Sequence, residues 1–445
     1  IYLAQAMENL RGSNEVYRRV ALESVEGVVD LVKRVGAEFV RGTPAQARYE
    51  AARGPALAAL EFYATFTRQE LPQRGEFDWR MGPDRFDAKW KYYLQVSQSP
   101  NEILRLAEDS LETTRVEMLR LARPLHSDWF PDHRHDDADP QQFLNQIVGE
   151  VLTSLGGEHT HRDSLLEQAT RDAGDIAAVI RDRRIVSLDQ VSNLRIISTP
   201  PFMRASYGVA GAVFAPALQP NLEAFYWVTP IPSDWPGDRA EAKLREYNRY
   251  KMLTLTVHEA LPGHVVQSEY ANRVLPEWRR VLRSVYGNTP YAEGWAVYAE
   301  HMMEAAGVNG GDSVKARLTA LKAMLRLYAN AIIDIRLHTM GMSGDEAIGL
   351  MTQRAFQERP EAEGKLQRAQ LDYVQLNTYM AGLQEWNALR RDAERAERDG
   401  FNLCRYHDTV LLYGAIPVPA VRRLYMAGVA PTAKAPPSRC ESQGT

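Results

Sequence analysis

The sequence predicts a mainly α-helical protein that contains one small β-sheet, and two patterns carry this prediction. Apolar residues recur three or four positions apart through most of residues 1–190 and again through 313–339, which is the period of an amphipathic helix. Between them, residues 185–232 hold short β-branched and aromatic runs bounded by Pro and Gly. We therefore expect antiparallel helices packed through their apolar stripes, with a small sheet beside them.

Each predicted element has its own boundary signal. Pro-Asn-Glu at 100–102 is typical of a helix start, and an apolar stripe follows it. A second stripe over 143–155 ends at a Gly-Gly pair, and a third covers 165–180. The strands are expected at three runs, 184–188, 195–198 and 225–228.

The 445 residues are enough for a large core or for two domains. We expect residues 1–190 to form a helical wall of a cleft. Residues 191–430 would form the catalytic region with the sheet. The Pro-, Ala- and Ser-rich residues 431–445 would fray. The sequence does not indicate an oligomeric state.

Charge and hydropathy exclude several classes of partner. The net charge is −4 and no long basic run occurs, which argues against nucleic acid and anionic membrane surfaces. No apolar stretch approaches the length of a transmembrane helix. Cys404 and Cys440 are too few for a disulfide framework or a thiolate metal site, and they leave the compartment undecided.

A candidate metal site lies in the run Thr-Leu-Thr-Val-His-Glu-Ala-Leu-Pro-Gly-His at 254–264. It places His258, Glu259 and His264 within seven residues. Imidazole is a common zinc ligand, and a carboxylate beside the metal can take a proton from its water. The pattern is similar to H-E-x-x-H, but the second His comes six positions after the first.

That spacing is unfavourable on a straight helix, where six residues rise about 9 Å and turn to another face. Pro262 and Gly263 lie between the two His, however. Proline breaks or kinks a helix, and glycine permits unusual backbone angles. We expect a break that returns His264 to His258. The alternative is a buried helix end with two hydrogen-bonded His.

A second motif at 291–301 supplies carboxylates. Glu293 and Glu300 are seven residues apart in an apolar segment and share a helix face. A catalytic zinc site needs three protein ligands and one open position. We expect Glu293 to be the third ligand and Glu300 to orient a His from behind, although the sequence permits the reverse.

These motifs, HEALPGH followed by EGWAVYAE, resemble those of the domain-of-unknown-function 885 family, predicted bacterial zinc metallopeptidases. Segments 225–228, 334–341, 379–382 and 413–419 are also similar to it. The resemblance covers nearly the whole chain. It implies a large helical metallopeptidase-like fold and a bacterial source. Family members are usually longer at the N-terminus, so we expect a processed form, periplasmic or secreted if a signal peptide was removed.

Further residues are candidates for catalysis and substrate binding. Tyr379 could stabilise an oxyanion, a role that the resemblance favours over simple packing. His338, four residues after Asp334, could be held in one tautomer and do the same. Arg336 could meet a substrate carboxylate.

Residues 225–228 could form an edge strand that pairs with an extended substrate, with Tyr226 and Trp227 in contact with it. Packing of these aromatics in the core explains the run equally well. His133 and His135 lie in an Asp-rich stretch that could bind metal, but a solvated loop is the favoured interpretation.

The leading hypothesis is a zinc-dependent hydrolase of peptide or other amide bonds, acting on short peptides. His258, His264 and Glu293 would hold zinc and Glu259 would be the general base. Two alternatives remain. Two His and a carboxylate also bind non-haem iron, and a non-catalytic helical peptide-binding protein could retain a degenerate metal site.

Overall fold

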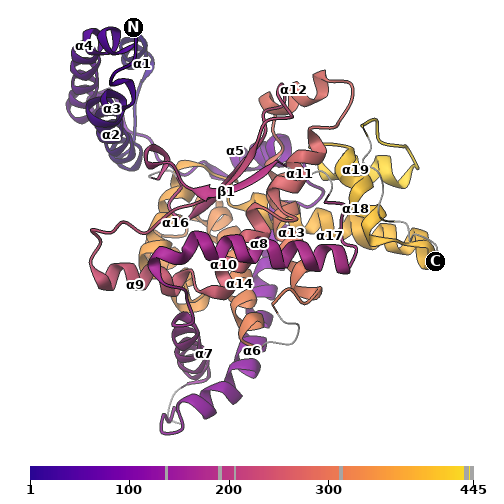
Figure 1. Cartoon of the computed structure of the whole chain (residues 1–445). Helices are drawn as coiled ribbons and strands as arrows, with labels where there is room; N and C mark the ends of the chain where they lie inside the picture. Colours follow the sequence, from indigo (N-terminus) through magenta and orange to yellow (C-terminus); the bar gives the residue numbers. More distant parts are fainter. Residues whose placement is uncertain (136–138, 189–192, 205–206, 310–313, 435–439, 441–445) are drawn as a thin grey trace.

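The computed structural model describes residues 1–135, 139–188, 193–204, 207–309, 314–434 and 440 (Figure 1). It is mainly α-helical with one three-stranded sheet, as the sequence predicted. Most of the tail expected to fray, 435–439 and 441–445, lies outside these residues. Among the described helices, none is long and apolar enough to cross a bilayer.

Helices occupy the chain before and after the sheet. The first group is α1 (Tyr2–Asn9), α2 (Glu15–Asp30), α3 (Gly36–Val40), α4 (Gln46–Thr65), α5 (Gly82–Lys89), α6 (Pro100–Trp129), α7 (Pro140–Gly156) and α8 (Leu165–Asp182). The second group is α9 (Gly237–Glu246), α10 (Arg249–Glu259), α11 (His264–Ala271), α12 (Trp278–Val285), α13 (Thr289–Ala305), α14 (Val314–Thr339), α15 (Gly344–Gly349), α16 (Arg359–Leu371), α17 (Asn377–Glu397), α18 (Leu403–Leu412) and α19 (Val418–Met426).

The N-terminal region has two parts. Helices α1–α4, drawn in indigo, project from the rest of the molecule (Figure 1), and Arg19 Nη1 of α2 donates to Gln367 Oε1 of α16 at 2.8 Å. Helix α6 begins where predicted, because Ser99 and Glu102 form a capping box. It packs on α7 and α14, while α8 packs on α10 and β1. The division at residue 190 stays a prediction.

The observed sheet differs from the predicted one in two respects. Its strands are β1 (Leu194–Ser198), β2 (Ala210–Val213) and β3 (Ala224–Val228), and the run 184–188 forms no strand. The order is β1-β3-β2, with β3 parallel to β1 and antiparallel to β2. Strand β3 is therefore central, and both of its edges are paired. It cannot receive a substrate strand, and β2 is the free edge nearer to α10.

The core is centred on α13 and α17, which cross at two glycines. A Cβ atom on Gly294 would lie 2.3 Å from the carbonyl carbon of Gly382, and one on Gly382 would lie 2.1 Å from the carbonyl oxygen of Pro290. Only glycine permits this approach of backbones. Buried Trp295 and Trp386 pack edge to face beside the crossing, with ring centroids 5.1 Å apart.

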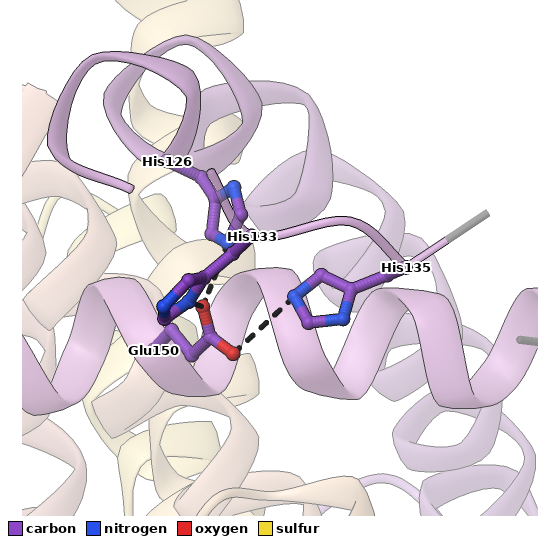
Figure 2. Close-up of side chains that lie close together, drawn as sticks. All are labelled: His126, His133, His135 and Glu150. Atoms are coloured by element: carbon purple, nitrogen blue, oxygen red, sulfur yellow. Dashed lines mark hydrogen bonds and ion pairs between the residues drawn. The ribbon is translucent and has the colours of Figure 1, made fainter. Parts of the chain in front are cut away.

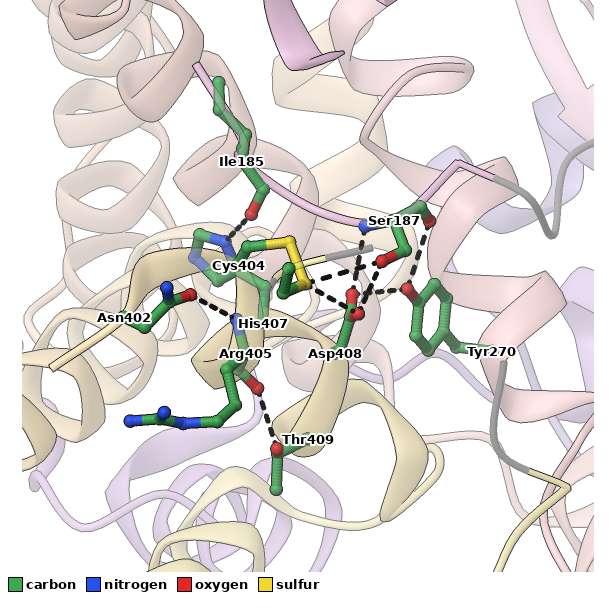
Figure 3. The surroundings of a disulfide bond; sticks show 10 residues. Ile185, Ser187, Tyr270, Asn402, Cys404, Arg405, His407, Asp408 and Thr409 are labelled. Atoms are coloured by element: carbon green, nitrogen blue, oxygen red, sulfur yellow. Dashed lines mark hydrogen bonds between the residues drawn. A yellow bond between two sulfur atoms is a disulfide. The ribbon is translucent and has the colours of Figure 1, made fainter. Parts of the chain in front are cut away.

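A disulfide joins Cys404 of α18 to Cys440 (Figure 3). Next to it, Asp408 accepts hydrogen bonds from the backbone N–H of Ser187 at 3.0 Å and from its hydroxyl at 2.7 Å. The hydroxyl of Tyr270 donates to the same carboxylate. This buried network connects α18 to α11 and to the segment before the sheet. The sequence alone predicted no such pairing.

The glycine crossing predicts the effect of a single methyl group. Gly382→Ala should lower the free energy of unfolding by about 1–3 kcal/mol, because backbone must move to admit the Cβ. Gly364→Ala in α16 is the matched control, since no atom lies within 4 Å of its Cβ position. It should be neutral or slightly stabilising. Denaturant unfolding of both variants checks this, and equal stability would contradict the proposed steric constraint.

Candidate metal centre

The helix break between α10 and α11 brings two imidazoles together. Helix α10 ends at Glu259 and α11 begins at His264. In the turn, the N–H of Gly263 donates to the carbonyl of Val257 at 3.0 Å. A Cβ on Gly263 would lie 1.9 Å from the carbonyl oxygen of His258, so this position requires glycine. The rings of His258 and His264 are perpendicular, with centroids 4.8 Å apart.

Glu293 of α13 completes a set of three converging side chains. Its Oε2 lies 3.4 Å from His258 Nε2 and 3.5 Å from His264 Nε2. With zinc bonds of about 2.0–2.1 Å, neighbouring tetrahedral ligand atoms lie about 3.3–3.4 Å apart. Glu293 Oε2 is buried and has no hydrogen-bond partner among the described residues. The spacing and this unsatisfied oxygen fit a metal ion between the three residues.

Glu300 lies behind His258, seven residues after Glu293 on the same face of α13. His258 Nδ1–H donates to Glu300 Oε1 at 2.6 Å, which leaves the Nε2 lone pair directed at Glu293. Burial disfavours the imidazolium, but the nearby carboxylates of Glu293 and Glu300 outweigh it and raise the pKa of His258 to about 10. Burial raises the pKa of Glu293, but the two nearby imidazoles outweigh this and lower it overall. Geometry thus favours Glu293 as the ligand and Glu300 as the support.

The carboxylate of Glu259 is held by the sheet. The backbone N–H of Ala212 in β2 donates to Glu259 Oε2 at 3.1 Å. Glu259 and His258 line the same cavity, whose volume is about 400 Å³. Ala210 of β2 lines it too. The edge strand therefore borders the cavity and orients the proposed base.

Tyr379, near the start of α17, also lines the cavity. Burial raises the pKa of its hydroxyl, and the negative charge of Glu293 adds to this shift. The hydroxyl therefore stays protonated and can donate a hydrogen bond. It accepts one from Arg368 Nη2 at 3.3 Å. Tyr379 thus lines the same cavity as His258 and Glu259, and its role as a donor stays a prediction.

His338 and Asp334 do not act as predicted. His338 is 2% exposed; it accepts from Met81 N–H at 3.4 Å, and its Nε2–H donates to Ala369 O at 2.9 Å. Both ring nitrogens are used inside the core, and burial lowers the pKa of His338. Asp334 instead accepts from Val374 N–H and from Asn377 Nδ2, and burial raises its pKa to about 7. It supports the turn that leads into α17.

The predicted substrate contacts are also corrected. Tyr226 is fully buried, and its hydroxyl lies 3.1 Å from Thr256 Oγ1. Trp227 packs edge-on against Tyr207, which itself lines the cavity. Arg336 forms an ion pair with Glu108 of α6 at 2.6 Å and is not among the cavity-lining residues. Arg336 therefore contacts α6 and does not line the cavity.

The sequence reasoning missed four cations that line the cavity: Lys251, Arg326, Lys365 and Arg368. They come from α10, α14 and α16, and only Lys365 and Arg368, three residues apart on α16, are related by a local spacing. Their positions follow only from how the three helices pack.

The chain is similar to known proteins in sequence and in fold. A search of curated proteins found no match. A solved structure from Shewanella oneidensis, described as a putative lipoprotein of unknown function, is 26% identical, with a TM-score of 0.82 over 96% of this chain and 76% of that one. A crystal structure described as that of a putative lipoprotein from Colwellia psychrerythraea is 18% identical and shows a similar fold, with a TM-score of 0.72 over 93% of this chain and 70% of that one. Over residues 2–424 the chain matches the model for "Bacterial protein of unknown function (DUF885)", and it belongs to that family.

Proposed function

We propose that this protein is a zinc-dependent hydrolase of peptide or other amide bonds. The observation that carries the proposal is the convergence of His258, His264 and Glu293 beside Glu259. Three protein ligands leave one position open, which is the arrangement of catalytic rather than structural zinc sites. The limited volume of the cavity, about 400 Å³, favours short peptides over folded proteins.

Each residue has a role that its position supports. A bound zinc ion would supply the positive charge that lowers the pKa of water toward neutrality. Glu259, oriented by β2, accepts the proton of the attacking water and passes it to the leaving amine. Tyr379 donates a hydrogen bond to the oxyanion that forms on the substrate carbonyl. His258 is held in one tautomer by Glu300.

The edge strand β2 takes the role that the sequence assigned to 225–228. Because residues alternate along a strand, Ala210 N–H points to the same side as Ala212 N–H, which reaches Glu259. Ala210 also lines the cavity. An extended peptide can therefore pair with β2 at Ala210 and lie across the metal centre.

The same three side chains also match the set that binds non-haem iron. Glu259 favours hydrolysis, because a base beside the open position serves water activation and has no evident role in oxygen chemistry. A non-catalytic binding protein would have no use for Glu259 and Tyr379 in one cavity. Metal analysis separates iron from zinc.

We further propose that the protein works in an oxidising compartment, the periplasm or the cell exterior. The buried Cys404–Cys440 disulfide supports this, since such bonds persist mainly outside reducing cytosol. The descriptions of the two similar structures are compatible with it.

The ligand set predicts the metal content of one variant. His264→Ala should lose the metal of this centre, because two ligands remain where three are needed. Elemental analysis after purification without added metal measures this directly. His161→Ala is the control, since that side chain is 72% exposed. Unchanged metal at this centre in His264→Ala would contradict the assignment.

The proposed base predicts a second outcome. Glu259→Gln should keep its metal and lose activity by about 10²–10⁴-fold, because the amide cannot accept a proton. Glu241→Gln, an exposed carboxylate on α9, is the matched control and should stay active. Steady-state rates on a library of short peptides, measured with metal content, check this. Full activity of Glu259→Gln would remove the base from the mechanism.

A further inference from the structure

Four side chains of types that commonly bind metal ions converge where the loop joins α6 to α7 (Figure 2). His126 comes from α6, His133 and His135 from the connecting loop, and Glu150 from α7. Glu150 Oε2 lies 2.8 Å from His126 Nε2 and 2.9 Å from His133 Nδ1, while Oε1 lies 3.3 Å from His135 Nε2. The four ligand atoms all lie within 4.8 Å of one another. Residues 131–134 of the loop are exposed, as expected, and the loop nevertheless brings His133 and His135 to Glu150.

The cluster is partly shielded from water. His126 is 4% exposed and the side chain of His135 is 13% exposed. His135 Nε2 is buried and has no hydrogen-bond partner among the described residues. Burial raises the pKa of Glu150, but hydrogen bonds from His133 and His126 outweigh it, and the net pKa is lowered.

We propose that His126, His133, His135 and Glu150 form a second site for a divalent transition metal. Three imidazoles and one carboxylate suit Zn²⁺, and they also suit Cu²⁺ or Ni²⁺. Four protein ligands leave no position for water, in contrast to the three at the His258 centre. The site is therefore structural, and it clips the loop after α6 onto α7.

A hydrogen-bonded cluster without metal is the competing arrangement. It would direct the N–H groups of His126 and His133 at one carboxylate and leave His135 Nε2 without a hydrogen bond. A metal ion satisfies all four groups at once. The distances of 2.8 and 2.9 Å fit both arrangements, so metal binding itself must be measured.

The test isolates this site by removing the other one. In His264→Ala protein, titration with Zn²⁺ against a chromogenic chelator should show about one tight site per chain. Adding His135→Ala should abolish it, and adding the control His161→Ala should not. His133→Asn is a second variant, since His133 is 52% exposed and its loss should not unfold the protein. No tight site in His264→Ala, or one unaffected by His135→Ala and His133→Asn, would overturn the proposal.

A second observation concerns the cavity at the His258 centre. Lys251, Arg326, Lys365 and Arg368 line it. Arg326 forms an ion pair with Glu361 at 2.7 Å. Lys365, which is 8% exposed, has no ion-pair partner within 4 Å among the described residues. Burial, together with Arg326 and Arg368, lowers the pKa of Lys365 to about 7. A buried cation beside like charges is unfavourable unless an anion joins it.

We infer that this cationic end of the cavity binds a carboxylate of the substrate, namely the terminal carboxylate of a short peptide. The inference rests on the proposed hydrolase function. Arg368 donates to Tyr379, which connects the cationic end to the proposed oxyanion donor. A terminal carboxylate held there would direct cleavage to a bond near the C-terminus.

The experiment compares one peptide as free acid and as C-terminal amide. KM for the free acid should rise about 10- to 100-fold in Lys365→Met, which keeps the volume and removes the charge, with kcat little changed. Lys322→Met is the control, because Lys322 pairs with Glu246 and lies outside this cavity. A third peptide, amidated but with an acidic side chain near its C-terminus, separates the two sources of carboxylate.

Three outcomes would overturn parts of this scheme. Equal KM for acid and amide, unchanged in Lys365→Met, would refute the carboxylate subsite while the hydrolase stands. Preference for the acidic side chain would refute the terminal carboxylate. Cleavage of none of the peptides by zinc-loaded protein, with no binding by calorimetry, would refute the proposed function and this inference together.

Discussion

The candidate metal centre depends on one close contact between backbone atoms, at the turn between α10 and α11. A continuous helix would carry His264 away from His258, whereas the turn folds the chain back until Gly263 touches the carbonyl of His258. Trp295 Nε1–H donates to the Pro262 carbonyl at 2.9 Å and fixes this turn to α13. Glu293 lies two residues before Trp295, so the same contact sets the position of the third proposed ligand.

Helix α13 joins the parts of the site that come from distant segments. It carries Glu293 toward both imidazoles and Glu300 behind His258. Between the ligand and Trp295 lies Gly294, where α17 approaches closely. That approach brings Tyr379 to the cavity. Packing in the core and geometry at the metal centre are therefore set by the same few residues of one helix.

Local motifs predicted the helices and the approach of His264 to His258, because neighbours in sequence fix those spacings. The second motif supplied Glu293, and the family resemblance pointed to Tyr379; their roles stay predictions. They failed where direction depends on tertiary packing. His338 shares a helix face with Asp334, yet each bonds to a different segment. Strand β2 was missed because its small residues carry little strand signal. The partners of His133, namely His126 and Glu150, are up to 17 residues away, and only the hairpin brings them together.

The support of Glu259 by β2 has a consequence for how this site tolerates mutation. The donor is a backbone N–H, so it does not depend on the side chain at position 212. Every residue except proline supplies the same N–H there. A substitution at position 212, other than to proline, therefore keeps the hydrogen bond that orients the proposed base. The hydrogen bond to Glu259 therefore sets no requirement on the chemistry of the side chain at position 212.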